Sequence, residues 1–110
     1  MTEKLFVYGT LGPNRPNEHI LKNIGGTWED ATVNGKLTDE GWGAEMGYPG
    51  IILDKNEEEI KGFIFTSSNL SNHWNMLDDF EGEGYERVIT KAKLEDKTIV
   101  DTYIYILQSI

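Results

Sequence analysis

Five carboxylates lie within eleven residues in the second half of the sequence, in the stretch LDDFEGEGYER. These acids are Asp78, Asp79, Glu81, Glu83 and Glu86. Neighbouring like charges raise one another's pKa, and a general base that works near neutral pH needs a carboxyl with a raised pKa. Two interpretations follow. The stretch is a solvated acidic turn, or one of its carboxylates performs acid–base chemistry.

The residues around these acids predict a helix of about three turns, from about Ser71 to Phe80. Leu70, Trp74 and Leu77 are spaced by four and three residues, which places them on one helical face. Gly82 suits the position just after the helix, where a positive φ is common. Side chains that can cap the helix start are those of Ser67, Ser68, Asn69 and Ser71.

This helix puts Asp78, Asp79 and Glu81 at its carboxyl end, where the helix dipole carries partial negative charge. The dipole therefore raises the pKa of a carboxyl there, and a position that breaks a local design rule is often functional. Charge alone does not choose among the acids. Glu81 directly precedes the glycine that ends the helix, whereas Glu83 lies between two glycines. Arg87 is expected to pair with one of the acids and to lower the pKa of that partner.

A second candidate for chemistry is VYGTLG, residues 7–12, where a predicted strand ends in Gly-Thr. Such a strand end leaves backbone N–H groups without partners in a sheet, and these groups can bind a carboxylate or an oxyanion. The same residues also fit an ordinary turn. The motif is weak when it is taken alone.

Around these two stretches the sequence is mostly strand. KLFVYGTL predicts an N-terminal strand that runs into a glycine turn, and GPNRPNEHILKNI predicts a loop followed by a short helical turn. GGTWEDATVNGKL predicts a hairpin at Asn34-Gly35, because this dipeptide tolerates a positive φ at both central turn positions. GWGAEMGYPG predicts an ordered, irregular loop.

The remaining segments predict two more pairs of strands. IILD and IKGFIFT lie on either side of the acidic turn KNEEE, and YERVITKAKL and TIVDTYIYIL alternate in polarity around a turn at Asp96-Lys97. The count is about six strands and one main helix, mostly in sequential antiparallel order. We therefore expect a single α+β domain over residues 1–110, with its sheet curved or closed into a small barrel.

Composition excludes several classes of function. The 110 residues carry a net charge of −9, from 19 acids against 10 bases, which argues against nucleic acids and anionic membranes as partners. Cysteine is absent, and His19 and His73 fit no ligand pattern, so neither a metal nor a cofactor is expected. The sequence has no signal-peptide pattern and no run of the ~20 apolar residues that span a membrane. We expect a cytoplasmic protein and, by default, a monomer.

Taken together, FVYGTL at residues 6–11 and LDDFEGEGYER at residues 77–87 resemble two motifs of the γ-glutamylcyclotransferase-like family. The resemblance is to its small branch, with the γ-glutamylamine cyclotransferases and the AIG2-like proteins. The family pattern is YG[ST]L followed later by LD-x-x-E-G-x-x-Y-x-R, and YPG at residues 48–50 is also similar. The resemblance implies an α+β fold around a small mixed-order β-barrel. It also implies an enzyme that cleaves a γ-glutamyl amide and releases 5-oxoproline.

The resemblance implies roles for particular residues. The family's catalytic glutamate, which is followed by glycine, corresponds to Glu81. The loop whose backbone N–H groups hold the glutamyl part of the substrate corresponds to Tyr8, Gly9, Thr10 and Leu11. The motif tyrosine corresponds to Tyr85. Some members carry the acid directly before this tyrosine, where this chain has Gly84, so Glu83 is the alternative to Glu81.

In the implied reaction the α-amine of the substrate attacks its own γ-carbonyl and closes a five-membered ring. One carboxyl serves first as base and then as acid for the departing amine. The identity of that amine stays open; the residues expected to shape its site are Asn14–Asn17 and Gly41–Pro49. Two other readings also stay open. One is a non-catalytic module that binds a small molecule or a partner in the same pocket, and the other is a β-rich interaction domain without a pocket.

Overall fold

The computed structural model describes residues 2–9, 11–15, 17–38, 50–82 and 84–107. These residues form six strands, two α-helices and one turn of 3-10 helix, so the predicted α+β class is confirmed. The strands are β1 (Glu3–Val7), β2 (Thr27–Thr38), β3 (Gly50–Leu53), β4 (Glu59–Ser67), β5 (Tyr85–Leu94) and β6 (Ile99–Leu107). The helical elements are α1 (Glu18–Ile24), η2 (Leu70–Asn72) and α2 (Trp74–Glu81). Within the described ranges, no helix has the length and apolar character needed to cross a membrane.

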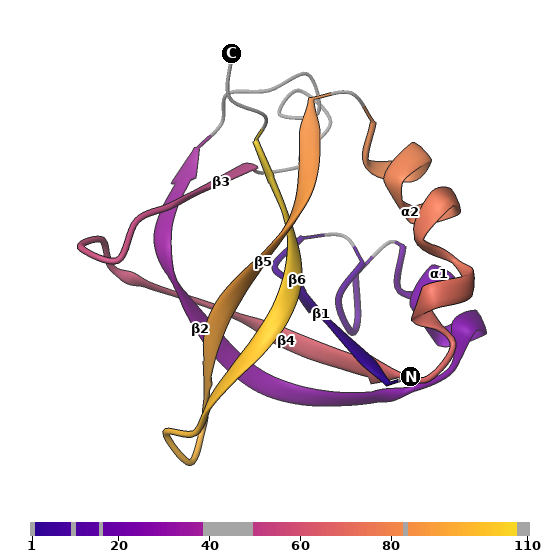
Figure 1. Ribbon diagram of the computed structural model, residues 1–110, viewed down its shortest axis with the longest axis horizontal. Helices are drawn as coiled ribbons and strands as arrows, with labels where there is room; N and C mark the ends of the chain where they lie inside the picture. Colours follow the sequence, from indigo (N-terminus) through magenta and orange to yellow (C-terminus); the bar gives the residue numbers. More distant parts are fainter. Residues whose placement is uncertain (1, 10, 16, 39–49, 83, 108–110) are drawn as a thin grey trace.

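Five of the strands close into a barrel, in the order β1, β4, β2, β5 and β6 (Figure 1). All neighbouring strands are antiparallel except β1 and β6, which run parallel and complete the ring. β3 lies outside the ring and pairs with the carboxyl end of β2. The predicted small, mixed-order barrel is therefore confirmed.

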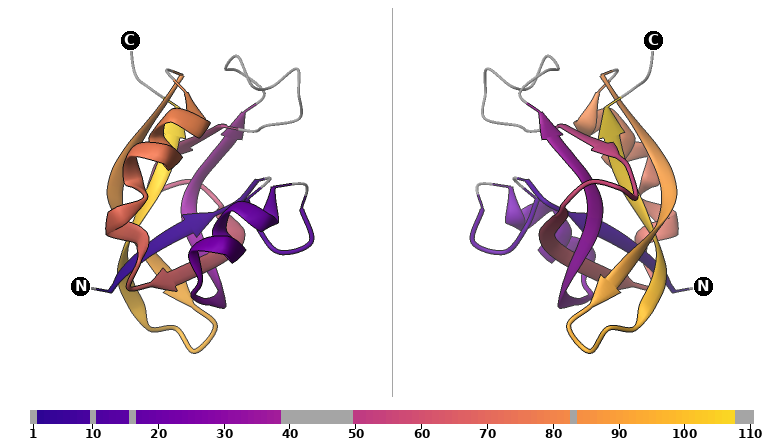
Figure 2. Two further views of the ribbon diagram at one scale, coloured as in Figure 1. Left: turned by 90° about the vertical axis from the view of Figure 1, so that its right-hand side faces the viewer. Right: turned by 90° about the vertical axis from the view of Figure 1, so that its left-hand side faces the viewer.

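The barrel separates two hydrophobic clusters. Alternate residues of β1 point to opposite faces, so Phe6 lies inside the barrel whereas Leu5 and Val7 pack outside it. The inner cluster is built mainly from β-branched and small residues, including Val33, Ile51, Ile60, Ile64 and Ile104. The outer cluster lies under α1 and α2, which occupy one side of the barrel (Figure 2), and includes Leu21, Phe65, Leu70 and Leu77. The helices are thus held by apolar packing on the outer wall.

The hairpin predicted at Asn34-Gly35 is wrong, because β2 continues through both residues. Neither residue has the positive φ that the predicted turn requires. Gly35 instead permits close packing: a Cβ atom there would lie 2.7 Å from the carbonyl oxygen of Ile52 and 3.3 Å from Cγ1 of Ile51. Long-range pairing with β3 and β4 overrides the local turn signal.

The predicted pairing of residues 51–54 with residues 60–66 is also wrong. Both segments are strands, β3 and β4, but β2 lies between them. The carbonyl of Asn34 accepts from the N–H of Asp54 at 3.2 Å, and the N–H of Gly35 donates to the carbonyl of Glu58 at 3.1 Å. Successive residues of a strand bond in opposite directions. The acidic turn therefore passes from one edge of β2 to the other.

The predicted helix is present but divided. Residues 70–72 form η2, His73 has a non-helical φ of −125°, and α2 begins at Trp74. None of the predicted capping side chains caps α2. Instead, Ser67 donates a hydrogen bond to the carbonyl of Gly25, and the side chain of Asn69 donates to the carbonyl of Ile24. These residues tie the 3-10 turn to the end of α1.

Two predicted turns are confirmed. Gly82 follows α2 with φ of 88°, although its ψ of −179° sends the chain away extended rather than curling it back. β5 and β6 form the predicted hairpin, in which Lys97 has φ of 74° and the N–H of Thr98 donates to the carboxylate of Asp96 at 2.9 Å. The short helical turn expected before residue 25 is α1.

Candidate active site

The last turn of α2 carries Glu81 onto the wall of the barrel. Trp74, Leu77, Asp78 and Glu81 follow one another at the spacing of a single helical face. Leu77 is fully buried in the outer cluster, which fixes this face toward the barrel. Glu81 is thereby largely shielded from water, and burial raises its pKa to about 7.

Two of the tyrosines expected at the site lie beside Glu81. Burial raises the pKa of Tyr8 well above its usual range, and the nearby charges of Glu81 and Tyr85 raise it further. The pKa of Tyr85 is likewise raised by burial and by the charge of Glu81. Tyr8 follows β1, Tyr85 begins β5, and Glu81 ends α2, so the fold brings these three residues together at one end of the barrel.

The loop after β1 has a different hydrogen-bonding pattern at each residue. Tyr8 uses its hydroxyl to donate to the carbonyl of Tyr105 at 2.7 Å, so this donor is already engaged within the protein. The carbonyl of Gly9 accepts from the N–H of Gly12 at 3.2 Å, and Leu11 is buried in the outer cluster. The N–H groups of Gly9 and Leu11 donate to no acceptor in the described ranges. These two donors are the ones suited to receive an anionic group of a ligand.

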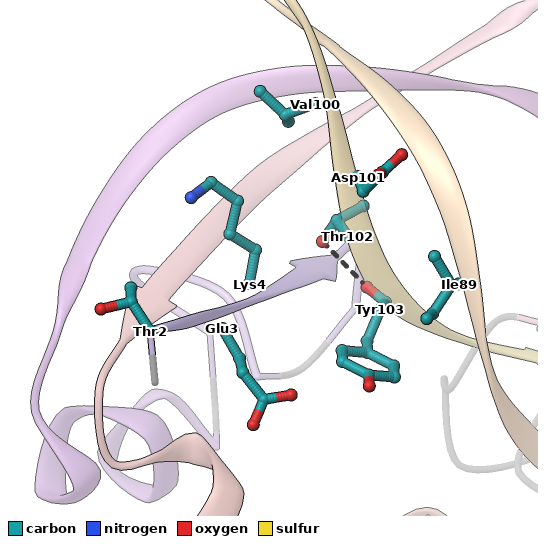
Figure 3. Close-up of a pocket in the computed structure, with 8 residues that line it drawn as sticks. All are labelled: Thr2, Glu3, Lys4, Ile89, Val100, Asp101, Thr102 and Tyr103. Carbon is teal, nitrogen blue, oxygen red and sulfur yellow. Dashed lines mark hydrogen bonds between the residues drawn. The ribbon is translucent and has the colours of Figure 1, made fainter.

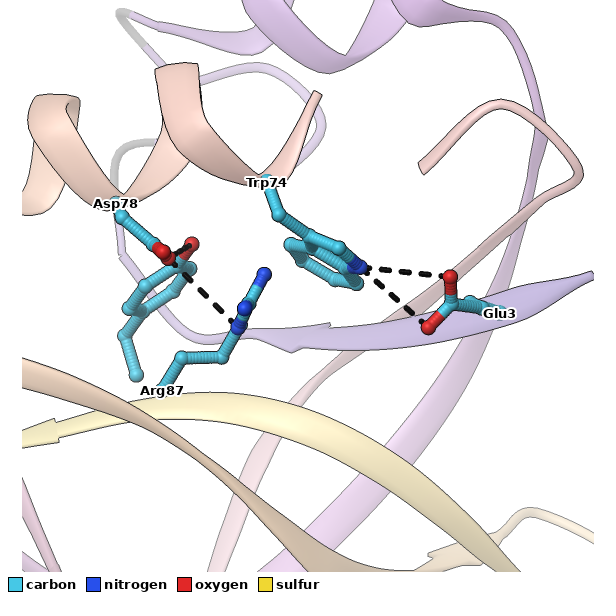
Figure 4. Close-up of polar contacts among 5 residues, drawn as sticks. Glu3, Trp74, Asp78 and Arg87 are labelled. Atoms are coloured by element: carbon cyan, nitrogen blue, oxygen red, sulfur yellow. Dashed lines mark hydrogen bonds and ion pairs between the residues drawn. The ribbon is translucent and has the colours of Figure 1, made fainter. Parts of the chain in front are cut away.

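A polar network that includes Trp74, Asp78 and Arg87 attaches α2 to the barrel (Figure 4). The hydroxyl of Tyr105 donates to Oδ1 of Asp78 at 2.6 Å. Nε of Arg87 lies 3.7 Å from the same oxygen, and its guanidinium carbon lies 4.3 Å from the ring centroid of Trp74. The Trp74 indole in turn reaches the carboxylate of Glu3 at 3.4 Å.

The sequence predicted part of this network. Pairing of Arg87 with one of the acids is confirmed, and the partner is Asp78. The sequence did not single out Asp78 among the five acids, but its carboxylate accepts a hydrogen bond from Tyr105 and so joins α2 to the barrel. Tyr105 was not singled out at all. The usable signal was helical spacing, because Asp78 precedes Glu81 by three residues and must share its face.

The cavities on the described part of the protein include the following three. One of about 400 Å³ lies between the end of α2 and the barrel and is lined in part by Asp78, Gly82, Tyr85, Arg87 and Tyr105. A second, of about 390 Å³, involves Lys4 of β1 with Val100 and Thr102 of β6 (Figure 3). A third, of about 500 Å³, is lined by charged residues of β2, β4 and β5. The first contains the predicted site residue Tyr85, and the third includes Arg15, from the stretch expected to shape the site of the departing amine.

Several expectations fall on residues outside the described ranges. These are Thr10, Glu83 and the predicted loop over residues 41–49. Within the described ranges, Asn14 has φ of 63° and its N–H is bound by the carboxylate of Glu18 at 3.0 Å. No group of three or more His, Cys, Asp or Glu residues suited to a metal ion occurs in the part of the chain that the structure describes.

The fold and site together define a small closed-barrel protein with a shielded carboxyl at the end of a helix. The sequence matches the family described as "Gamma-glutamyl cyclotransferase, AIG2-like" over residues 5–109. The chain therefore belongs to this family, as its two motifs predicted. No curated protein matches the sequence.

Solved structures with the same fold include YkqA from Bacillus subtilis, at 28% sequence identity and a TM-score of 0.74. That match covers 98% of this chain and 36% of YkqA, so this chain spans about a third of the length of the Bacillus protein. An AIG2-like protein from Mus musculus is 20% identical, with a TM-score of 0.73 over 99% of this chain and 79% of that chain. A gamma-glutamyl cyclotransferase is 17% identical, with a TM-score of 0.70 over 99% and 68%. The last two likenesses concern the fold alone.

Proposed function

We propose that this protein cleaves a γ-glutamyl amide by intramolecular attack of the substrate's α-amine, releasing 5-oxoproline and a free amine or amino acid. The observation that carries the proposal is the shielded carboxyl of Glu81, whose pKa of about 7 suits a group that both accepts and returns a proton near neutral pH. Membership of the cyclotransferase family supports the same reaction.

In this reaction a C–N bond forms between the α-nitrogen and the γ-carbonyl carbon, and the bond from that carbon to the departing nitrogen breaks. The α-ammonium loses two protons in all, and the departing amine gains two. Glu81 accepts a proton from the α-nitrogen and returns it to the departing nitrogen. The N–H groups of Gly9 and Leu11 are the proposed donors to the substrate's α-carboxylate or to the oxyanion. Tyr85 is proposed to line the same site.

The substrate is held folded, with its nucleophile and its electrophile in the same molecule. The protein therefore has little to supply beyond positioning, one proton carrier and hydrogen-bond donors. The proposed chemistry calls on no cofactor. The departing amine is the part of the substrate that the proposal leaves open, and a panel of substrates is needed to find it.

The test is incubation of the purified protein with a panel of γ-glutamyl amides and peptides, with 5-oxoproline measured by mass spectrometry. We expect release from at least one member of the panel. Glu81→Gln is expected to lower kcat by roughly 100-fold or more while leaving the fold intact, because glutamine cannot carry the proton. The circular dichroism spectrum of the variant checks the fold.

The matched control is Glu86→Gln, which removes an exposed carboxylate from the same acidic stretch. This variant is expected to keep near-normal turnover. Full activity in Glu81→Gln would refute the assigned role. Binding of γ-glutamyl compounds without any release of 5-oxoproline by the wild-type protein would instead favour the non-catalytic binding module.

A further inference from the structure

The position of Glu81 depends on contacts made by other residues of α2. Burial raises the pKa of its carboxyl to about 7. The residues one and two turns earlier on the same face do make specific contacts. Leu77 is buried in the outer cluster, Asp78 binds Tyr105, and Trp74 packs at 4.9 Å from the ring centroid of Tyr103.

Tyr105 of β6 is shared by both sides of the site. Its side-chain hydroxyl donates to Asp78 of α2, and its backbone carbonyl accepts from Tyr8, which follows β1. The residue is only 3% exposed, so it has little room to move. The helix that carries Glu81 and the loop that carries Tyr8 are therefore both hydrogen-bonded to the same buried residue, Tyr105.

Arg87 brings a positive charge into the same region. Its guanidinium lies over the rings of Trp74 and Tyr103, 4.3 and 5.4 Å from their centroids. Its Nη1 atom is buried and donates to no acceptor in the described ranges. Within those ranges, Asp78 is the only carboxylate that forms an ion pair with it. Arg87 is thus neutralised by one carboxylate on the helix that carries Glu81.

Arg87 pairs with Asp78, which precedes Glu81 by three residues on the same face of α2. Burial and then the hydrogen bond to Asp78 raise the pKa of Tyr105, while the charge of Arg87 lowers it and the charge of Glu81 raises it. An arginine without a compensating carboxylate favours the ionised form of a nearby glutamate. Loss of the Asp78 charge would leave Arg87 without its ion-pair partner one helical turn before Glu81.

We propose that Asp78 is the positioning residue of this site: it ties the last turn of α2 to β6 through Tyr105, and it screens Glu81 from the guanidinium of Arg87. The first role fixes where the carboxyl of Glu81 lies. The second keeps that carboxyl basic. As far as it concerns catalysis, this inference rests on the proposed cyclotransferase function.

The charged and titratable groups around Glu81 that bear on its ionisation come from each element packed against α2. They are Tyr8 after β1, Tyr85 and Arg87 on β5, Tyr105 on β6, and Asp78 on α2 itself, whereas Asp79 on α2 is exposed. Arg87 is the only cation among them. Removing the carboxylate charge of Asp78 would therefore leave the positive charge of Arg87 unpaired in this region.

The test separates the two roles by using two variants. Asp78→Asn keeps an oxygen that accepts from Tyr105 but removes the charge that neutralises Arg87. In a plot of kcat/KM against pH, we expect the low-pH side of the curve, the acid limb, to move to lower pH by roughly one unit. Tyr105→Phe keeps both charges but removes the hydrogen bond to α2. Here we expect kcat to fall roughly three- to ten-fold with the acid limb unchanged.

Two controls accompany these variants. Asp79→Asn removes the same charge from the next, exposed residue and is expected to leave the profile in place. In the double variant Asp78→Asn with Arg87→Met, the acid limb is expected to return toward its wild-type position, because the uncompensated cation is gone. A return of the profile in the double variant is not expected if Asp78 only stabilises the fold.

A measurement that needs no substrate keeps this inference separate from the proposed function. The side-chain carboxyl of Glu81 is titrated by carbon-13 NMR and assigned by its loss in Glu81→Gln. A lower pKa in Asp78→Asn supports the screening role even if no substrate is ever turned over. An unchanged titration in Asp78→Asn, together with wild-type kcat in Tyr105→Phe, would overturn the inference. Absence of 5-oxoproline release by the wild type counts against the proposed function alone.

Discussion

At the scale of single residues, the site depends on one carboxyl kept away from water. A glutamate ordinarily ionises near pH 4.5, whereas burial at the end of α2 moves this pKa to about 7. Burial of a charged group without a partner costs free energy, and the cost falls on the ionised form. Stability and function therefore oppose each other at Glu81, since the form that accepts a proton is the form that the fold tolerates least.

This conflict predicts how stability depends on pH. Between about pH 4.5 and 7 the folded protein keeps a proton on Glu81 that the unfolded chain has released, so stability falls as the pH rises through that window. The glutamine of Glu81→Gln does not ionise, so the stability of this variant lacks this dependence on pH. At pH 8 the variant is expected to be more stable than the wild type by roughly 1–3 kcal/mol, and at pH 4 the difference should vanish.

Urea unfolding of both proteins at several pH values measures this difference. The same series on Glu86→Gln, at an exposed position, provides the control and should show no comparable trend. A stability difference that stays constant from pH 4 to pH 8 would show that glutamine acts through packing and not through the loss of charge.

At the scale of elements, α2 is too short to be stable on its own. It has eight residues, and no side-chain cap closes its start. Its position is set instead by Leu77 and Asp78 against the barrel, and by Gly82 at its end. The φ of 88° at Gly82 turns the chain directly after Glu81 and sends it into β5.

Gly82→Ala is therefore expected to be costly. The backbone conformation at this residue, φ of 88° with ψ of −179°, is open essentially to glycine alone. We expect a loss of stability of about 1–3 kcal/mol in urea unfolding. Gly12→Ala serves as the control, because its φ is not positive and its added Cβ would meet its nearest neighbour, the carbonyl oxygen of Gly9, at 3.4 Å. Equal losses in the two variants would contradict the role given to the exit turn.

At the scale of the whole molecule, closure of the barrel gathers the site. The ends of β1 and β6 and the start of β5 lie at one end of the ring because β1 and β6 run parallel and β5 runs antiparallel to β6. Closure also requires tight packing inside the ring. A Cβ atom on Gly62 of β4 would lie 2.5 Å from both Cζ of Phe6 and the carbonyl oxygen of Val7.

Gly62→Ala is expected to destabilise the barrel by about 1–3 kcal/mol, because neither the buried ring nor the backbone of β1 can give way cheaply. Urea unfolding measures the loss. Lys61→Ala, at the exposed neighbouring position on the same strand, is expected to change stability by no more than about 0.5 kcal/mol. If the two variants unfold alike, close approach of β4 to β1 is not what requires glycine here.

The parts of the fold that follow from local patterns were predictable. The alternation of residues 85–94 and 99–107 predicted the β5–β6 hairpin, and the spacing of Leu70, Trp74 and Leu77 predicted the main helical region. The errors lie where distant segments compete with local signals. Asn34-Gly35 has the composition of a turn, yet the pairing of β2 with both β3 and β4 keeps it extended. Pairing between strands that are far apart in the chain cannot be recognised from the residues of one short segment.

The sequence by itself determined the class of fold, the family, and the acidic stretch from which the candidate catalytic glutamate comes. Those features rest on periodicity and short motifs, which are written in neighbouring residues. Only the tertiary structure decided that Asp78 binds Tyr105 and Arg87, and that Tyr8 and Tyr85 lie beside Glu81. These pairs lie up to 73 positions apart in the chain, the separation of Tyr8 and Glu81, and closure of the barrel, not any local preference, brings them together. Among the described acids of residues 77–87, which are Asp78, Asp79, Glu81 and Glu86, burial is what sets Glu81 apart.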